Sequence, residues 1–251
     1  MKSNRFAEKD IPYQSLNQFA LSREMIEDLP MHVLDEILSG RHSPVLPMRV
    51  TDENGQTLET RSRFSLVRLE SGNVDVIFYP VLKPSPLGQY STKQQKLLAE
   101  GKAILADVEL TDGKQSKAFV QIDSETNQVI SAPTPVISRN LQVIAKELRL
   151  GPTEVKLLQH GEPLTFVIED EPITVGIDLN DHTGVRMMQG DSQKWKEQSK
   201  KDWDKYTFGL YGCWVMDDDG NLDYVPEENY TEELWNEQQK SGQRNAASYH
   251  K

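Results

Sequence analysis

Apolar and polar positions follow the same order twice in the middle of the chain. In KLLAEGKAILADVEL (96–110), a helical run with two leucines ends at a glycine, and alternating apolar residues follow. KLLQHGEPLTFVIED (156–170) has the same order, and further on VQID (120–123) is matched by VGID (175–178). A glycine just past a helix and alternation along a strand are typical of a helix that leads into a β-hairpin. The pattern therefore predicts two copies of one helix–hairpin unit.

Residues beside these runs support the same prediction. Ser91 is a candidate N-cap of the first helix, and Pro152 suits the first turn of the second. Because a short helix and a lone hairpin are each marginal in water, we expect Leu97–Leu98 and Leu157–Leu158 to pack on the apolar faces of the hairpins. Duplication has one alternative, which is that any helix–glycine–strand junction selects similar residues.

The start of the chain follows this plan more weakly, which predicts a third copy. Ser22 is a candidate N-cap for REMIEDL, Pro30 interrupts the run, and MHVLDEILSG ends at Gly40. Strands are predicted around VLPMRV, RFSLVRL and VDVIFY, separated by the turn sequences DENG and SGN. The predicted class is α+β, with short helices packed on antiparallel β-hairpins and a helix–hairpin unit at least twice duplicated.

The last sixty residues follow a different pattern. SQKWKEQSKKDWDKY (192–206) predicts one charged helix, capped by Asp191 or Ser192. One face of this helix is predicted to carry Trp195, Ser199, Trp203 and Tyr206. FGLYGCWVM then predicts a strand, DDDGN a turn and LDYV the returning strand. TEELWNEQQKSG predicts a closing helix with Thr231 as its N-cap and Gly242 just past its end.

These elements divide the chain into three predicted parts. The proline-containing segment KPSPLGQYS is the first linker, and SAPTPVIS separates the first copy from a helix around NLQVIAKEL. We expect an N-terminal α+β module at 1–86, tandem helix–hairpin repeats at 87–190, and an acidic, aromatic-rich α+β segment at 191–251.

Composition favours a cytoplasmic protein. Cys213 is the one cysteine of 251 residues, so no internal disulfide forms, which fits a reducing compartment. No run of 18 apolar residues occurs, and MKSNRFAEKD has no apolar stretch typical of a signal peptide. No membrane contact is predicted. Cys213 stands in an apolar strand, which favours a buried, inert thiol over a nucleophile.

Charge is concentrated in the C-terminal part of the chain. The net charge is −11, and nine acidic residues lie between Tyr206 and Gln239, where there is no Lys or Arg. Such a surface repels the phosphate backbone and attracts basic partners, so direct nucleic-acid contact is disfavoured there. The alternative is a face that only keeps the protein soluble.

Two patterns are candidates for ligand chemistry. A twelve-residue window has acidic or amide residues at the EF-hand positions 1, 3, 5, 7 and 12, namely Asp217, Asp219, Asn221, Asp223 and Glu228. Leu222 stands where that loop needs glycine, and strands flank it, so an ordinary hairpin turn is favoured over a calcium site. The segment Lys194–Lys205 mixes bases with tryptophans, as single-strand binding grooves do, but its aromatic residues share a face and acids dilute its charge.

No catalytic, cofactor-binding or metal-ligating residue is assigned. The histidines show no metal-ligand spacing, and His182 falls on a predicted turn. No nucleophile elbow, phosphate-binding loop or dinucleotide glycine motif is present. A catalytic site built from distant residues would leave no such motif, so the enzyme class stays open but is not predicted.

Two stretches resemble bacterial domain families of unknown function. DIPYQSLNQFALSREMIEDL with LDEILSGRHSPVLPMRV is similar to one family. YSTKQQKLLAEGKAILADVEL with GCWVMDDDGNLDYVPEENYTEELW is similar to a second, which tends to occur in tandem. The resemblance implies an accessory protein of mobile, conjugative or integrative DNA elements, and it implies no site residues.

The sequence therefore favours a non-enzymatic interaction or scaffold module. Its acidic, aromatic segment Gly212–Trp235 would meet a basic protein, for which the resemblance suggests a DNA-processing or conjugation protein. The alternative is a DNA-mimicking or DNA-contacting regulator of element maintenance or transfer. The oligomeric state is left open.

Overall fold

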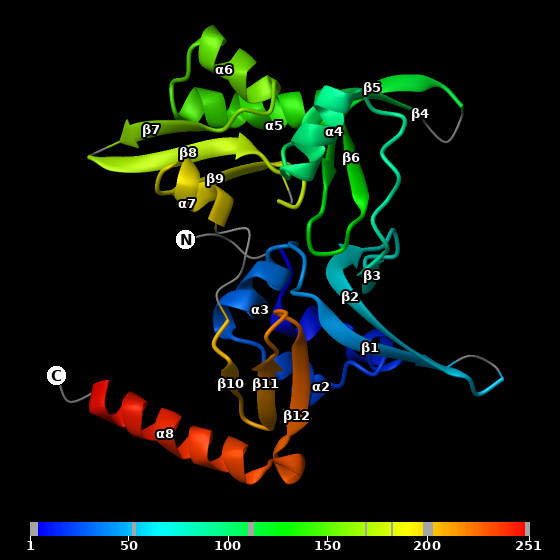
Figure 1. Ribbon diagram of the computed structural model, residues 1–251, viewed down its shortest axis with the longest axis vertical. Coiled ribbons are helices and arrows are strands. Elements are labelled where there is room, and N and C mark those ends of the chain that lie inside the picture. Colours follow the sequence, from blue (N-terminus) through cyan, green and yellow to red (C-terminus); the bar gives the residue numbers. More distant parts are fainter. Residues whose placement is uncertain are drawn as a thin grey trace. The chain divides into compact units, whose positions relative to one another are not determined.

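The computed structural model describes residues 5–51, 54–109, 113–168, 170–181, 183–197 and 203–248. Within them, four antiparallel three-stranded sheets alternate with helices (Figure 1). The predicted α+β class with repeated hairpin units is confirmed. The chain folds as two compact units, which are Met1–Pro80 with Asp202–Lys251 (unit 1) and Val81–Lys201 (unit 2).

Unit 2 contains the same succession of elements twice. The first group is α4 (Thr92–Ala99), β4 (Ile104–Glu109), β5 (Gln115–Ile122), β6 (Val129–Pro133) and α5 (Thr134–Glu147). The second group is α6 (Pro152–Gln159), β7 (Leu164–Ile168), β8 (Glu171–Ile177), β9 (Val185–Gln189) and α7 (Ser192–Glu197). Each predicted hairpin is therefore two strands of a three-stranded sheet, with orders β4-β5-β6 and β7-β8-β9.

Strand register agrees between the two groups. The matching cross-strand pairs are Ile104 with Val120 and Leu164 with Val175, then Ile122 with Val129 and Ile177 with Val185. The leucine doublets also occupy like settings, because Leu98 and Leu158 are fully buried whereas Leu157 is 45% exposed and Leu97 only partly buried. The repeated plan is thus present in three dimensions, and its origin by duplication stays a prediction.

Both helices of this plan begin and end as the sequence indicates. The Ser91 hydroxyl accepts from the Gln94 N–H, and Pro152 opens α6. Gly101 and Gly161 have φ of +74° and +83°, which favours glycine. A Cβ at Gly161 would also collide with the Ala103 carbonyl oxygen. The second group therefore packs closely on the first.

One hydrophobic core joins the two groups. It takes Phe119 from β5, Leu141 from α5, Leu158 from α6 and Val175 from β8. The buried Gln121 side chain adds polar links, because it donates to the Gly101 carbonyl at 2.9 Å and accepts from the Leu179 N–H at 2.6 Å. Burial of a shared face supplies the stability that each group lacks alone.

Unit 1 is assembled from both ends of the chain. The N-terminal part supplies η1 (Glu8–Asp10), α1 (Tyr13–Asn17), α2 (Arg23–Glu27), α3 (Met31–Leu38), β1 (Leu46–Thr51), β2 (Thr57–Arg68) and β3 (Val74–Pro80). The C-terminal part supplies β10 (Tyr206–Phe208), β11 (Gly212–Met216), β12 (Leu222–Pro226), η2 (Glu227–Asn229) and α8 (Glu232–Ser248). The sheets have the orders β1-β2-β3 and β10-β11-β12.

The two parts of unit 1 share a hydrophobic core. Trp214 and Leu222 from the C-terminal part pack in one cluster with Leu16, Ile26 and Phe64. In space, residues 203–248 therefore fold with the N-terminal part. The division of the sequence at 86 and 190 stays a prediction about sequence modules.

Two helix predictions in this region are wrong. The predicted helix 192–206 is wrong at its end, because Trp203 is not helical and Tyr206 lies on β10, while α7 covers Ser192–Glu197. Trp195 belongs to unit 2, whereas Trp203 packs against Trp214 in unit 1 with ring centres 6.5 Å apart. These side chains therefore share no helical face, and Ser199 lies outside the described residues. Gly242 lies inside α8, since a glycine costs a helix only about 1 kcal/mol.

Three other helix starts bear on the sequence predictions. The Ser22 hydroxyl accepts from the Met25 N–H, and the Thr231 hydroxyl accepts from the Leu234 N–H, as expected of N-caps. α5 begins at Thr134, inside the segment expected to separate it from the first copy, because a proline is tolerated in a first turn. None of the helices in the described part of the chain combines the length and the apolar character that a membrane span requires.

The buried leucine of each group is expected to carry the stability of unit 2. Leu98→Ala or Leu158→Ala leaves a cavity beside a sheet and should lower the free energy of unfolding by about 2–5 kcal/mol. Leu157→Ala is the matched control, because that side chain is 45% exposed, and it should cost less than about 1 kcal/mol. Urea unfolding followed by circular dichroism measures all three, and equal losses at 157 and 158 would contradict the assignment.

Candidate functional site

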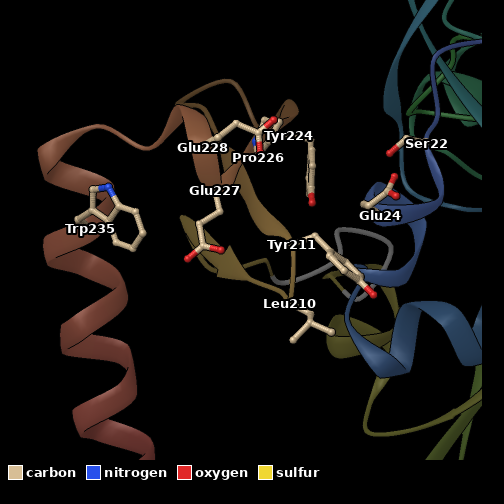
Figure 2. A pocket seen from close by; sticks show the side chains of 9 residues that line it. All are labelled: Ser22, Glu24, Leu210, Tyr211, Tyr224, Pro226, Glu227, Glu228 and Trp235. Carbon is tan, nitrogen blue, oxygen red and sulfur yellow. The ribbon is translucent and has the colours of Figure 1, made fainter.

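A groove of about 760 Å³ opens on unit 1 (Figure 2). Its walls come from the start of α2, the turn between β10 and β11, the end of β12, η2 and the first turn of α8. The side chains that give it its character are Leu210, Tyr211 and Trp235, which are apolar or aromatic, and Glu24, Glu227 and Glu228, which are acidic. It is a candidate binding site because it combines accessible apolar surface with charge.

A buried carboxylate holds the β10–β11 turn in place. Asp28, which directly follows α2, is 4% exposed. Its Oδ1 accepts from the Leu210 N–H at 2.6 Å, and its Oδ2 accepts from the Tyr211 N–H at 3.0 Å and from the Tyr224 hydroxyl at 2.6 Å. A Cβ at Gly209 would collide with this carboxyl group, so glycine permits the close approach. The backbone that presents Leu210 and Tyr211 is thereby fixed.

Two aromatic side chains, Trp214 and Tyr224, pack against each other next to the groove. The Trp214 ring is fully buried, its Nε1–H donates to the Met25 carbonyl at 3.1 Å, and its centre lies 5.2 Å from that of Tyr224. Burial and the hydrogen bond to Asp28 raise the pKa of the Tyr224 hydroxyl, so this group stays protonated. The Trp214 and Tyr224 side chains are therefore held in fixed positions by their contacts with each other and with Met25 and Asp28.

The groove side chains themselves reach solvent. Leu210 is 78% exposed, Tyr211 42% and Trp235 41%. The Trp235 ring packs edge-on against Tyr230 with centres 5.1 Å apart, and the neighbouring Leu234 is buried, which anchors the first turn of α8. Three large side chains exposed in one groove are typical of a surface that binds another molecule.

The charge of the groove is negative. Glu24, Glu227 and Glu228 are exposed, and no ion pair joins any of them to another residue in the described ranges. Hydrogen bonding at the start of α2, from its own backbone and from Ser22, lowers the pKa of the Glu24 carboxyl. The groove therefore offers carboxylates to a cationic partner.

The window at 217–228 begins with a hairpin turn between β11 and β12, as favoured from the sequence, and continues through β12 into η2. Asp217 accepts from the backbone N–H groups of Asp219 and Asn221, and Asp223 pairs with Arg61 at 2.7 Å. Among the described residues, no group of three or more His, Cys, Asp or Glu side chains is placed to hold a metal ion. The Asp217 carboxylate is thus used by its own turn.

Cys213 is a buried thiol, as predicted. Its side chain is fully buried on β11, and burial raises its pKa to about 11. At neutral pH the group is therefore a thiol without nucleophilic character.

The basic segment Lys194–Lys205 is divided between the two units. Lys194 belongs to α7 of unit 2, whereas Lys205 lies in unit 1 beside the Tyr206 ring at 5.1 Å. Of the bases between them, Lys196 is on α7, and Lys200 and Lys201 lie outside the described residues, as does His182. Nucleic-acid contact by this segment stays a prediction.

Sequence reasoning located only part of the groove. The acidic, aromatic segment Gly212–Trp235 was identified, but Asp28, Glu24 and Leu210 were not. Asp28 stands 182 residues from Leu210 along the chain, and its local sequence is that of an ordinary helix end. A weak signal was available in the paired glycines of GLYG, which permit a close backbone approach.

Comparison with known proteins covers about one third of the chain. Residues 6–89 match the model of a family described as a protein of unknown function (DUF4099). No curated protein and no solved structure matches the chain significantly. The matched segment contains Glu24 and Asp28 but not residues 203–248, which complete the core of unit 1. The second resemblance and the link to mobile elements stay predictions.

Removing the Asp28 carboxylate should destabilise unit 1. Asp28→Ala leaves two backbone N–H groups and a tyrosine hydroxyl without their acceptor, which should cost about 3 kcal/mol. Asp28→Asn keeps one acceptor oxygen and should cost less. Labelling of Cys213, the one cysteine of the chain, measures the opening of unit 1 and should accelerate in the order wild type, Asn, Ala. Equal labelling rates would contradict the anchoring role.

Stability of unit 1 should fall in alkali through Tyr224. Its pKa is raised in the folded state, so above pH ~10 the unfolded chain loses this proton while the folded chain keeps it. The contribution is complete below that pH and falls by up to about 1.4 kcal/mol per pH unit above it. The stability difference between wild type and Tyr224→Phe should therefore shrink above pH ~10 in urea titrations. A difference that stays constant to pH ~11 would rule this out.

Proposed function

We propose that this protein is a non-enzymatic interaction module whose groove on unit 1 binds a segment of a basic protein. The carrying observation is the exposure of Leu210, Tyr211 and Trp235 in one groove, together with carboxylates that have no ion-pair partner among the described residues. Aromatic anchors supply binding energy and charges supply attraction at a distance.

The negative charge of the groove favours a basic protein over a nucleic acid as the partner. Nine acids and no Lys or Arg lie between Tyr206 and Gln239, and this stretch forms most of the groove. Such a potential attracts cationic surfaces and repels phosphate backbones. The family resemblance suggests a DNA-processing or conjugation protein of a mobile element as that partner, with this chain as its accessory scaffold.

Truncation of the groove should weaken the complex. The double variant Leu210→Ala with Trp235→Ala should lower affinity by about tenfold or more, because both side chains would be anchors. Leu58→Ala is the matched control, since this leucine of β2 is 65% exposed and lies outside the groove. The measurement is quantitative cross-linking of the tagged chain in cells that carry the natural gene, followed by affinity measurement with the purified partner.

The salt dependence of binding is a second test of the same complex. Charge reversal at Glu24 and Glu228, two exposed carboxylates of the groove, should weaken binding more in low salt than in high salt, because exposed charges are screened. A partner that is retained equally by wild type and groove variants, or that lacks a basic surface, would refute the proposal.

A further inference from the structure

Among the described residues, three arginines each lie beside both a carboxylate and an aromatic ring. The sets are Arg23 with Glu27 and Tyr13, Arg68 with Asp10 and Phe6, and Arg186 with Asp178 and Trp195. The ion-pair distances are 2.7, 3.7 and 2.9 Å, and the guanidinium carbons lie 5.0, 5.5 and 4.1 Å from the ring centres. A guanidinium satisfies both neighbours at once, since its edge donates to the carboxylate while its face stacks on the ring.

The groove presents an exposed carboxylate and an exposed aromatic ring, and no Lys or Arg is among the described residues that line it. In Figure 2 the Glu227 carboxylate lies in the space between Trp235 on α8 and the turn that carries Leu210 and Tyr211. Trp235 is 41% exposed, and its edge-on contact with Tyr230 leaves indole surface open to a ligand. The Glu227 carboxylate and the Trp235 ring therefore offer the two contacts that an arginine side chain makes elsewhere in the protein.

We propose that the groove selects an arginine side chain of the partner, bound to Glu227 and stacked on Trp235. This rests on the proposed function and specifies the chemistry of the bound segment. Arginine fits better than lysine because its planar, weakly hydrated group stacks on indole while it donates to a carboxylate. Leu210, at 78% exposure, would contact a large apolar residue beside that arginine.

A displayed library of random twelve-residue peptides, selected on the full-length chain, tests this directly. Wild type should enrich peptides in which an arginine stands near a large apolar residue. Glu227→Gln should remove the arginine preference, whereas the matched control Glu232→Gln, on α8 outside the groove, should keep it. The best peptide, resynthesised with lysine or citrulline in place of arginine, should bind about fivefold and at least about tenfold more weakly, respectively, by fluorescence anisotropy.

The outcomes separate the two proposals. Peptides that need Leu210 and Trp235 but show no arginine preference, or that tolerate citrulline, would overturn the arginine assignment and leave the interaction module intact. Peptides whose binding is unchanged by Leu210→Ala with Trp235→Ala would overturn both. Loss of binding in Glu227→Gln counts only if the Cys213 labelling rate stays at the wild-type value, which shows that unit 1 is still folded.

Discussion

The buried Asp28 carboxylate is the constraint on which unit 1 depends. It joins two segments that lie 182 residues apart, and it does so through the backbone of the very turn that exposes Leu210 and Tyr211. A buried carboxylate is costly unless its oxygens are satisfied, and here they accept from two backbone N–H groups and a hydroxyl. The same contacts that offset this cost define the geometry of the groove.

Apolar burial stabilises unit 2. Its two groups of elements share one apolar core, and polar contacts such as those of Gln121 fix their register. The first group also has a small cluster of its own around Leu98, Ile104 and Val120, and the shared core adds burial to it by bringing matching apolar faces together. Both units thus depend on apolar burial, and unit 1 adds the Asp28 carboxylate as a polar link between its two parts.

Local patterns predicted the elements well and their assembly poorly. Capping residues such as Ser91 and glycines such as Gly161 act within a few residues, so helix ends and hairpins followed from the sequence. The assignment of Trp195 and Trp203 to different units did not, because a continuous helical pattern carries no mark of the boundary between units. The contribution of Asp28 was equally hidden, since its partners are distant in sequence. For the candidate site, the acidic and aromatic character of residues 212–235 was visible in composition, but the gathering of Glu24, Glu227 and Trp235 around one groove depends on contacts between segments far apart in the sequence.

Assembly of unit 1 from both chain ends has a consequence for biosynthesis. Residues that pack on Leu16 and Ile26, Trp214 among them, leave the ribosome only after all of unit 2 has been translated. Unit 2 is contiguous and rich in local pairings, so it can fold during translation, while the nascent N-terminal segment waits with an incomplete core. Chaperones should therefore bind mainly to the first eighty residues. A chain that stops before β11 would lack the residues that complete the hydrophobic core of unit 1.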